Sequence, residues 1–294
     1  MILRFFTGFL LAGIYPVGMK IATDYYDKGL GKSLGFLVGA LVLGTALPHL
    51  LKNILNDFSW KSVLIATSSL AILGGLLMLI FVKNGPYRKS SKNVDLSACF
   101  KVFKNVNFRK AAFGYFGHMW ELYTFWAFVP ILLMTYKNSY NNITFNIPLL
   151  SFIIIGVGGF SCVLGGYLSE KIGVKKTAFR FLLLSCLCCI CAPFIFLVPN
   201  EYIFICFLVF WGMVVIADSP LFSTLVAQNA PQKDKGTALT IVNCVGFSIT
   251  IISIQLLSFL QDYFSTPYIY LVLVIGPLFG LYSTTVKTKF KWKQ

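Results

Sequence analysis

Long apolar runs alternate with short polar links along nearly the whole chain. Runs of about 18–25 residues can cross a bilayer as helices, because a helix rises about 1.5 Å per residue and the hydrocarbon core is about 30 Å thick. The pattern predicts an all-α polytopic membrane protein with nine transmembrane helices, at about 3–23, 31–55, 61–82, 109–136, 146–168, 177–198, 202–226, 236–260 and 267–286.

Composition supports a membrane protein over a soluble one. Hydrophobic residues make up 57% of the chain and charged residues only 12%, which is far from the usual balance of a soluble globule. The formal charge of +15 would suit a nucleic-acid partner. The basic residues, however, sit in the short links between apolar runs, as in membrane proteins. We therefore expect a lipid bilayer and no nucleic acid as partner.

The distribution of Lys and Arg predicts the orientation. One set of links carries 20 of these residues, and the opposite set, with the chain start, carries four. Cytoplasmic links carry the excess of positive charge. The first set, which we expect to face the cytoplasm, comprises 24–32, 83–110, 169–180, 231–235 and the tail from Lys287. This predicts a cytoplasmic C-terminus and an external N-terminus.

Ionisable residues inside the run 109–136 are the strongest candidates for function. Such groups are costly at membrane depth and commonly mark a substrate or ion path. His118 and Glu121 are three residues apart, so they share a helix face and could share a proton. The alternative is a self-satisfied polar pair that stabilises helix packing. The same run supplies hydroxyls and ring faces for a substrate cavity, from Tyr115, Trp120, Tyr123 and Trp126.

Asp218 is the second candidate, in the segment Ala-Asp-Ser-Pro. Pro220 removes a backbone donor, so the sequence predicts a locally broken helix at this point, and broken helices commonly line transport cavities. The alternative is a hydrogen bond to a neighbouring helix that serves packing. Asn243 is a secondary cavity candidate.

Four cysteines lie close together in the run 177–198, at Cys186, Cys188, Cys189 and Cys191. Thiolates bind soft metals, but on a helix these side chains spread over several faces. We expect helix contacts, with no metal site, no disulfide framework and no cofactor. The sequence also lacks the phosphate-binding and hydrolase motifs of enzymes.

The link Gly166–Lys176 reads GYLSEKIGVKK and resembles the loop motif of the major facilitator superfamily. The matching residues are Gly166, Glu170, Lys171, Gly173 and Lys175. By this resemblance, Glu170 would cap or pair with the start of a helix in the other half, near Gly31–Ser33, and close the cytoplasmic side.

The resemblance also implies a register. Family members typically have twelve helices in two halves of six, with a longer cytoplasmic loop between them. The longest polar link here would precede the seventh helix, and the loop motif follows the eighth, so the nine runs correspond to helices 4–12. The first three helices would be missing. This division gives an N-terminal bundle remnant at 1–82, a central loop at 83–108 with a short amphipathic helix, and a C-terminal bundle at 109–294.

Arg4 and Gly8 resemble the fourth-helix motif of the family. In relatives this Arg is associated with proton coupling. The alternative for Arg4 is an interfacial anchor whose long side chain reaches the membrane surface.

The resemblance implies a secondary transporter of a small solute, proton-coupled or facilitated, that works by alternating access. The ionisable residues His118, Glu121 and Asp218, with Arg4 from the resemblance, are the candidates for coupling to protons. The segments HMWELYTFWAF and ADSPLFSTLVAQNAP resemble permeases near the nitrate/nitrite and cyanate carriers, which favours a small anion. We expect a monomer in a bacterial inner membrane and not an enzyme. Two alternatives stay open, an inactive truncated fragment and a membrane-embedded enzyme that uses His118 and Glu121 as acid and base.

Overall fold

The computed structural model describes residues 2–26, 28–55, 58–88, 101–140, 143–231, 234–264 and 266–285. Over these ranges the chain is all-helical, as predicted, and contains no strand. The helices are α1 (Ile2–Ala12), α2 (Ile14–Tyr25), α3 (Leu30–Ile54), α4 (Trp60–Phe81), η1 (Val102–Lys104), α6 (Val106–Ser139), α7 (Ile147–Ile172), α8 (Val174–Phe196), α9 (Glu201–Ala217), α10 (Ser219–Asn229), α11 (Lys235–Tyr263), η3 (Pro267–Val274) and α12 (Ile275–Thr285).

Eight of the nine predicted runs coincide with helices long and apolar enough to cross a membrane. The ninth is α6, which has 34 residues and would extend for about 50 Å. Its aromatic and ionisable side chains lower its average hydropathy, although its length is more than sufficient. Most of these side chains are buried against other helices, so lipid does not have to solvate them.

Three predicted runs are interrupted rather than continuous. The first divides at Gly13 into α1 and α2, and the run 202–226 divides at Asp218 into α9 and α10. The run 267–286 begins as the eight-residue 3₁₀ helix η3 before α12. Pro277, near the start of α12, lacks the N–H that would continue an α-helical ladder through Leu273. Proline and glycine therefore interrupt helices that the hydropathy pattern alone represents as uniform.

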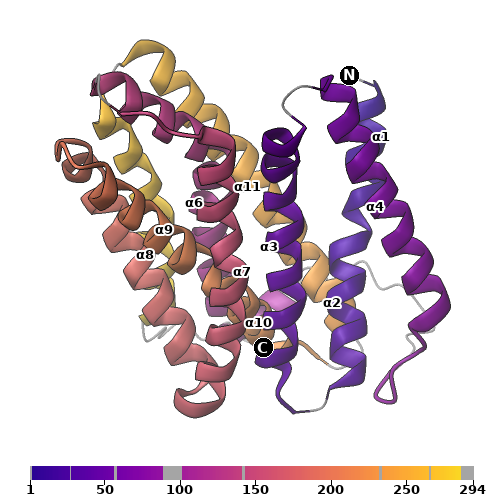
Figure 1. Cartoon of the computed structure of the whole chain (residues 1–294). Helices are drawn as coiled ribbons and strands as arrows, with labels where there is room; N and C mark the ends of the chain where they lie inside the picture. Colours follow the sequence, from indigo (N-terminus) through magenta and orange to yellow (C-terminus); the bar gives the residue numbers. More distant parts are fainter. Residues whose placement is uncertain are drawn as a thin grey trace.

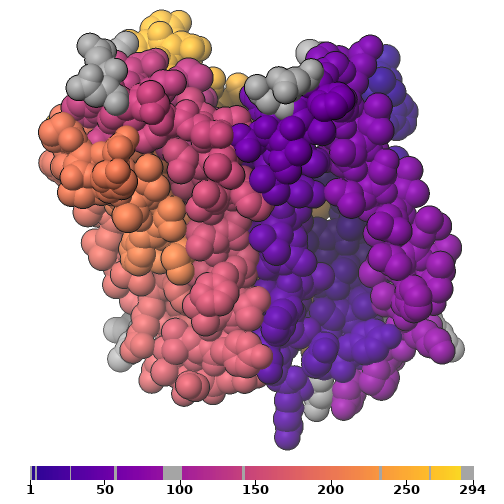
Figure 2. Space-filling model, in the orientation of Figure 1, coloured from indigo at the N-terminus to yellow at the C-terminus, as the bar shows by residue number. Residues whose placement is uncertain are grey.

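Figure 1 shows α1–α4 beside the larger group formed by α6–α12. The close junction between them is the packing of α3 along α7, and α2 also contacts α11. No residue of α4 is buried, and a hollow separates α4 from α3 on the face shown in Figure 2. The amphipathic helix predicted in the central link falls mostly within residues 89–100, which lie outside the described residues.

The α3–α7 contact depends on glycine at positions where backbone meets backbone. A Cβ on Gly35 would lie 2.7 Å from the carbonyl oxygen of Cys162, and one on Gly39 would lie 2.8 Å from that of Gly159. These distances are shorter than side chains tolerate, so both helices approach at the limit that glycine permits.

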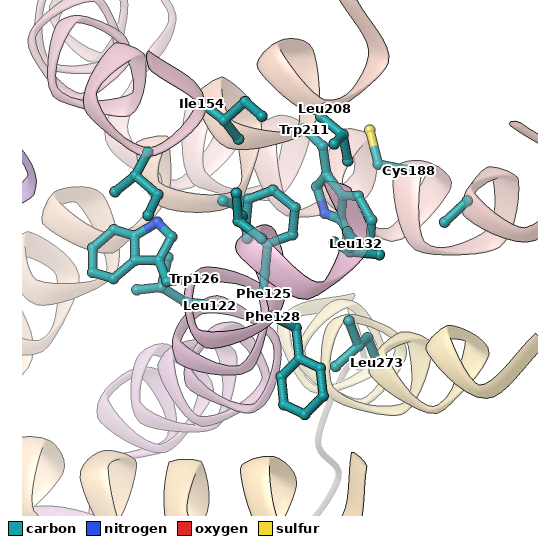
Figure 3. Close-up of a cluster of buried hydrophobic side chains, with 14 of the residues drawn as sticks. Leu122, Phe125, Trp126, Phe128, Leu132, Ile154, Cys188, Leu208, Trp211 and Leu273 are labelled. Carbon is teal, nitrogen blue, oxygen red and sulfur yellow. The ribbon is translucent and has the colours of Figure 1, made fainter. Parts of the chain in front are cut away.

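Aromatic packing fills the core of the larger group. The rings of Phe125 and Trp211 are 4.5 Å apart, and those of Tyr136 and Phe204 stack at 3.8 Å. In Figure 3, Trp126 and Trp211 lie on opposite sides of Phe125. α6 is therefore surrounded by its neighbours, which places its polar residues inside the protein.

We predict that Gly35→Ala lowers the thermal stability of the purified protein, because the added methyl group would separate α3 from α7. Overpacking of this kind costs about 1–3 kcal/mol. Gly44→Ala is the matched control on the same helix, since nothing lies within 4 Å of its Cβ position. Thermal unfolding in detergent measures both variants. Equal melting temperatures would show that the tight α3–α7 contact does not stabilise the fold.

Candidate substrate and proton site

His118 and Asp218 meet in the interior, between α6 and the junction of α9 with α10. The Nδ1 atom of His118 is 2.8 Å from an Oδ1 atom of Asp218, and the two residues are 1% and 0% exposed. The contact is an ion pair when the imidazole is protonated. Beyond this ion-pair contact, neither carboxylate oxygen of Asp218 has a hydrogen-bond partner among the described residues. The Nε2 atom of His118 also has no partner there.

The helix is interrupted at Asp218, as the sequence predicts. Because Pro220 has no N–H, it cannot donate to the carbonyl of Ile216. The thiol of Cys162 on α7 lies 3.6 Å from that oxygen and supplies a weak donor. The N–H groups of Leu221 and Phe222 both donate to the carbonyl of Asp218, at 3.0 and 2.9 Å. The interruption is therefore small. It breaks the regular pattern of backbone hydrogen bonds at the position from which the buried Asp218 carboxylate projects.

Tyrosine hydroxyls surround the pair. The Tyr115 hydroxyl donates to Oδ1 of Asn243 on α11 at 2.7 Å, and its ring lies 5.8 Å from that of His118. Tyr15 on α2 has its hydroxyl beside the side chains of Ser219 and Ser223 on α10. Residues from α2, α6, α10 and α11 therefore converge at one buried polar region.

Glu121 occupies a different position. Its Oε1 atom accepts hydrogen bonds from Ser185 Oγ at 2.5 Å and from Trp211 Nε1 at 2.7 Å, and the Cys189 thiol is also beside it. The proton sharing that we expected between Glu121 and His118 is not found. Residues three apart diverge enough around a helix for Glu121 to reach α8 and α9 while His118 reaches Asp218. Glu121 is 1% exposed, so it joins three helices in the core.

The aromatic residues predicted to line a substrate cavity also have different partners. Trp120 donates its indole N–H to the carbonyl of Val272 at 3.0 Å and thus holds α6 against η3. The indole N–H of Trp126 is buried without a partner among the described residues. The rings of Tyr123 and Trp126 are 5.2 Å apart, and Phe247 on α11 packs 5.3 Å from Tyr123. The indole N–H of Trp120 is therefore bonded within the protein, whereas that of Trp126 is not bonded to any described residue.

The loop motif lies against the start of α3. Gly29, the N-cap residue of α3, has φ of 72°, and a Cβ there would be 3.2 Å from Oε1 of Glu170. Gly166 lets the backbone at Lys32 approach, since its Cβ would be 2.8 Å from the Cα of Lys32. Gly173 has φ of 90° and forms the turn between α7 and α8. The motif therefore meets the segment that the resemblance indicated, with Lys171 exposed at the end of α7. Its role in gating stays a prediction.

The remaining candidates are Arg4 and the cysteines. Arg4 lies on α1, and its side chain falls outside the description. The seven cysteines in the described part of the chain are all free. No group of three or more His, Cys, Asp or Glu side chains suited to a metal occurs there.

Three residues that complete the polar interior were not predicted from the sequence. Ser185 and Trp211 stand in apolar runs and resemble ordinary packing residues, yet both bond Glu121. Tyr15 comes immediately before Pro16 near the chain start and reaches α10 only through the fold. A buried carboxylate needs donors, but sequence alone does not say which helices supply them.

Comparison with known proteins decides the family. Residues 1–254 match the family described as Major Facilitator Superfamily. The chain belongs to this superfamily. No curated protein matches the chain.

Among solved structures, the superfamily chain is similar to one described as "Crystal structure of a bacterial homologue of iron transporter ferroportin in outward-facing state". The identity is 16%, the TM-score is 0.57, and the match covers 87% of this chain and 68% of that one. At this identity the likeness concerns the fold alone. Family and fold together make the protein an integral membrane transporter that sits in a lipid bilayer and binds a small-molecule substrate.

We predict that Glu121→Gln keeps nearly the native thermal stability, whereas Glu121→Ala loses several degrees. The amide oxygen of Gln can still accept from Ser185 and Trp211, but Ala leaves both donors buried and unsatisfied, at about 1–3 kcal/mol for each. Thermal unfolding of the purified protein tests this. If Glu121→Gln were as unstable as Glu121→Ala, the carboxylate charge rather than the hydrogen bonds would hold the three helices.

Proposed function

We propose that the protein is a permease that carries a small anion together with protons by alternating access. The observation that carries the proposal is the buried His118–Asp218 pair at a helix interruption, with polar atoms that no described residue satisfies. Groups of this kind are expensive in a membrane interior and are commonly retained for transport.

The pair offers a route to coupling. With the imidazole protonated and Asp218 ionised, each charge compensates the other, and breaking such a buried pair costs about 3–5 kcal/mol. A proton on the Asp218 carboxylate removes its negative charge and leaves the imidazolium without a counter-ion. An anion then replaces the carboxylate beside His118. Proton and anion are bound together, and neither is favoured alone.

The surroundings favour an acceptor-rich solute. His118 Nε2 and Trp126 Nε1 are buried nitrogens without partners. A protonated imidazole and an indole both present N–H donors, which suits an oxyanion or a similar small anion. Tyr123 and Tyr15 add hydroxyls from α6 and α2.

Access requires the two groups of helices to separate, since His118 and Asp218 have almost no exposed surface. We assign residues 1–82 and 109–294 to the two bundles that rock about the buried site, joined by the link 83–108. The α3–α7 contact and the Glu170 loop would close one side. The distribution of Lys and Arg supports a cytoplasmic location for that side, with the C-terminus, in a bacterial inner membrane. The alternative of an acid–base enzyme that uses His118 and Glu121 together loses support, because these side chains bond different partners.

Transport by purified protein in liposomes tests the proposal. Nitrate, nitrite and cyanate are added outside vesicles that contain a pH-sensitive dye, and anion uptake and internal acidification are measured together. We predict that the wild type moves both. Asp218→Asn, which resembles the protonated carboxyl, should retain anion exchange and lose proton movement by at least tenfold. His118→Gln should lose both.

Asp262→Asn is the matched control, because Asp262 is exposed near the end of α11 and should behave as wild type. Full proton coupling in Asp218→Asn would remove the pair from the mechanism. A wild type that moves none of the three anions at any pH would contradict the substrate class.

A further inference from the structure

Two lysines line a small cavity at one end of the helix bundle, away from the buried pair. The cavity has a volume of about 240 Å³, and Lys110 on α6 and Lys175 on α8 carry its charge. Ala111 also lines the cavity. It precedes His118 by seven residues, so the cavity lies about 10 Å along α6 from the buried pair. The remaining lining residues are Asn107, Leu225, Asn229 and Thr284.

The walls come from four helices that pack against one another. α6 and α8 begin at the cavity, and α10 and α12 end there. Asn105 fixes the arrangement, because its Oδ1 accepts from the N–H of Asn107 at 2.9 Å while its Nδ2 donates to the carbonyl of Asn229 at 3.1 Å. The cavity is therefore built by the fold and does not need a ligand to form it.

The positive charge of the cavity is not compensated within the described chain. No lining residue is acidic, and neither Lys110 nor Lys175 forms an ion pair with a described carboxylate. The adjacent Arg109 is directed elsewhere, since it donates to the carbonyl of Phe103 at 2.9 Å. The N-cap residue of α8, Gly173, provides no side-chain cap, so the first N–H groups of this helix add positive partial charge near Lys175.

We infer that this cavity binds a phosphate group. Two ammonium groups on one cavity repel each other, and an anion between them converts that repulsion into attraction. Lysine binds phosphate as a point charge, the Asn107 side chain adds amide donors, and the volume accommodates a phosphate with water around it. The Lys- and Arg-rich end of the bundle is the one we place in the cytoplasm, where the phosphate can come from a phospholipid headgroup or from a soluble phosphate.

Bound phosphate would connect the first turn of α6 to the first turn of α8. Lys175 belongs to the loop motif. A phosphate bound here would therefore contact the end of the protein that we expect to open and close during transport. The inference does not depend on the identity of the transported solute, and a failed transport assay would leave it intact.

Thermal unfolding in nanodiscs tests the site. Wild type, the double variant Lys110→Gln/Lys175→Gln, and the control Lys176→Gln are placed in phosphatidylcholine discs and titrated with sodium phosphate at constant ionic strength. A second series replaces phosphatidylcholine, whose headgroup phosphate is balanced by the choline charge, with increasing fractions of the anionic lipid phosphatidylglycerol, and contains no free phosphate. Lys176→Gln removes the same charge one residue from Lys175 but does not line the cavity.

We expect a saturable rise in melting temperature for wild type and Lys176→Gln, and at least a tenfold higher half-saturating concentration, or no rise, for the double variant. A response in the first series identifies soluble phosphate, and a response only in the second identifies the lipid headgroup. The double variant Lys110→Arg/Lys175→Arg keeps both charges and should respond like wild type. This result would exclude misfolding as the reason why the Gln variant fails to respond. Equal responses of the double variant and Lys176→Gln in both series would overturn the inference.

Discussion

The contact between His118 and Asp218 is the interaction on which the interior depends. Two ionisable side chains with at most 1% exposure must compensate each other, because an isolated charge at this depth would cost several kcal/mol. This requirement brings the middle of α6 against the junction of α9 and α10. It also explains why α6, the longest of the described helices, is polar at its centre without being exposed to lipid.

The sequence predicts the helices well because hydropathy and helix length are local properties. Each of the nine predicted runs, including the one that forms α6, has a counterpart among the helices. The Asp-Ser-Pro string predicts the break at Asp218, because Pro220 lacks a backbone N–H whatever the tertiary structure around it. The 3₁₀ segment before α12 was not predicted. It depends on Pro277 together with the close packing of α6 and the Trp120–Val272 hydrogen bond, and only the first of these can be read from sequence.

The site is predictable by residue type but not by pairing. His118, Glu121 and Asp218 stand out because they are ionisable inside apolar runs. The spacing of His118 and Glu121 predicted that these two side chains interact. In the structure, His118 contacts Asp218. Glu121 accepts hydrogen bonds from Ser185 and Trp211 instead. The partner depends on which helix lies opposite each face of α6, and that information is long-range. Lys175 shows the same limit, because its place in a loop motif does not reveal that Lys110 lines the same cavity.

The most direct test of the central claim is a double-mutant cycle on His118→Gln and Asp218→Asn, measured by unfolding of the purified protein in mixed micelles. If the two side chains compensate each other, each single variant leaves a buried group without its partner, and the second substitution then adds little. The account predicts losses that fall short of additive by about 1 kcal/mol or more. Additive losses would contradict it, because they would mean that His118 and Asp218 contribute independently and that no pair organises the interior.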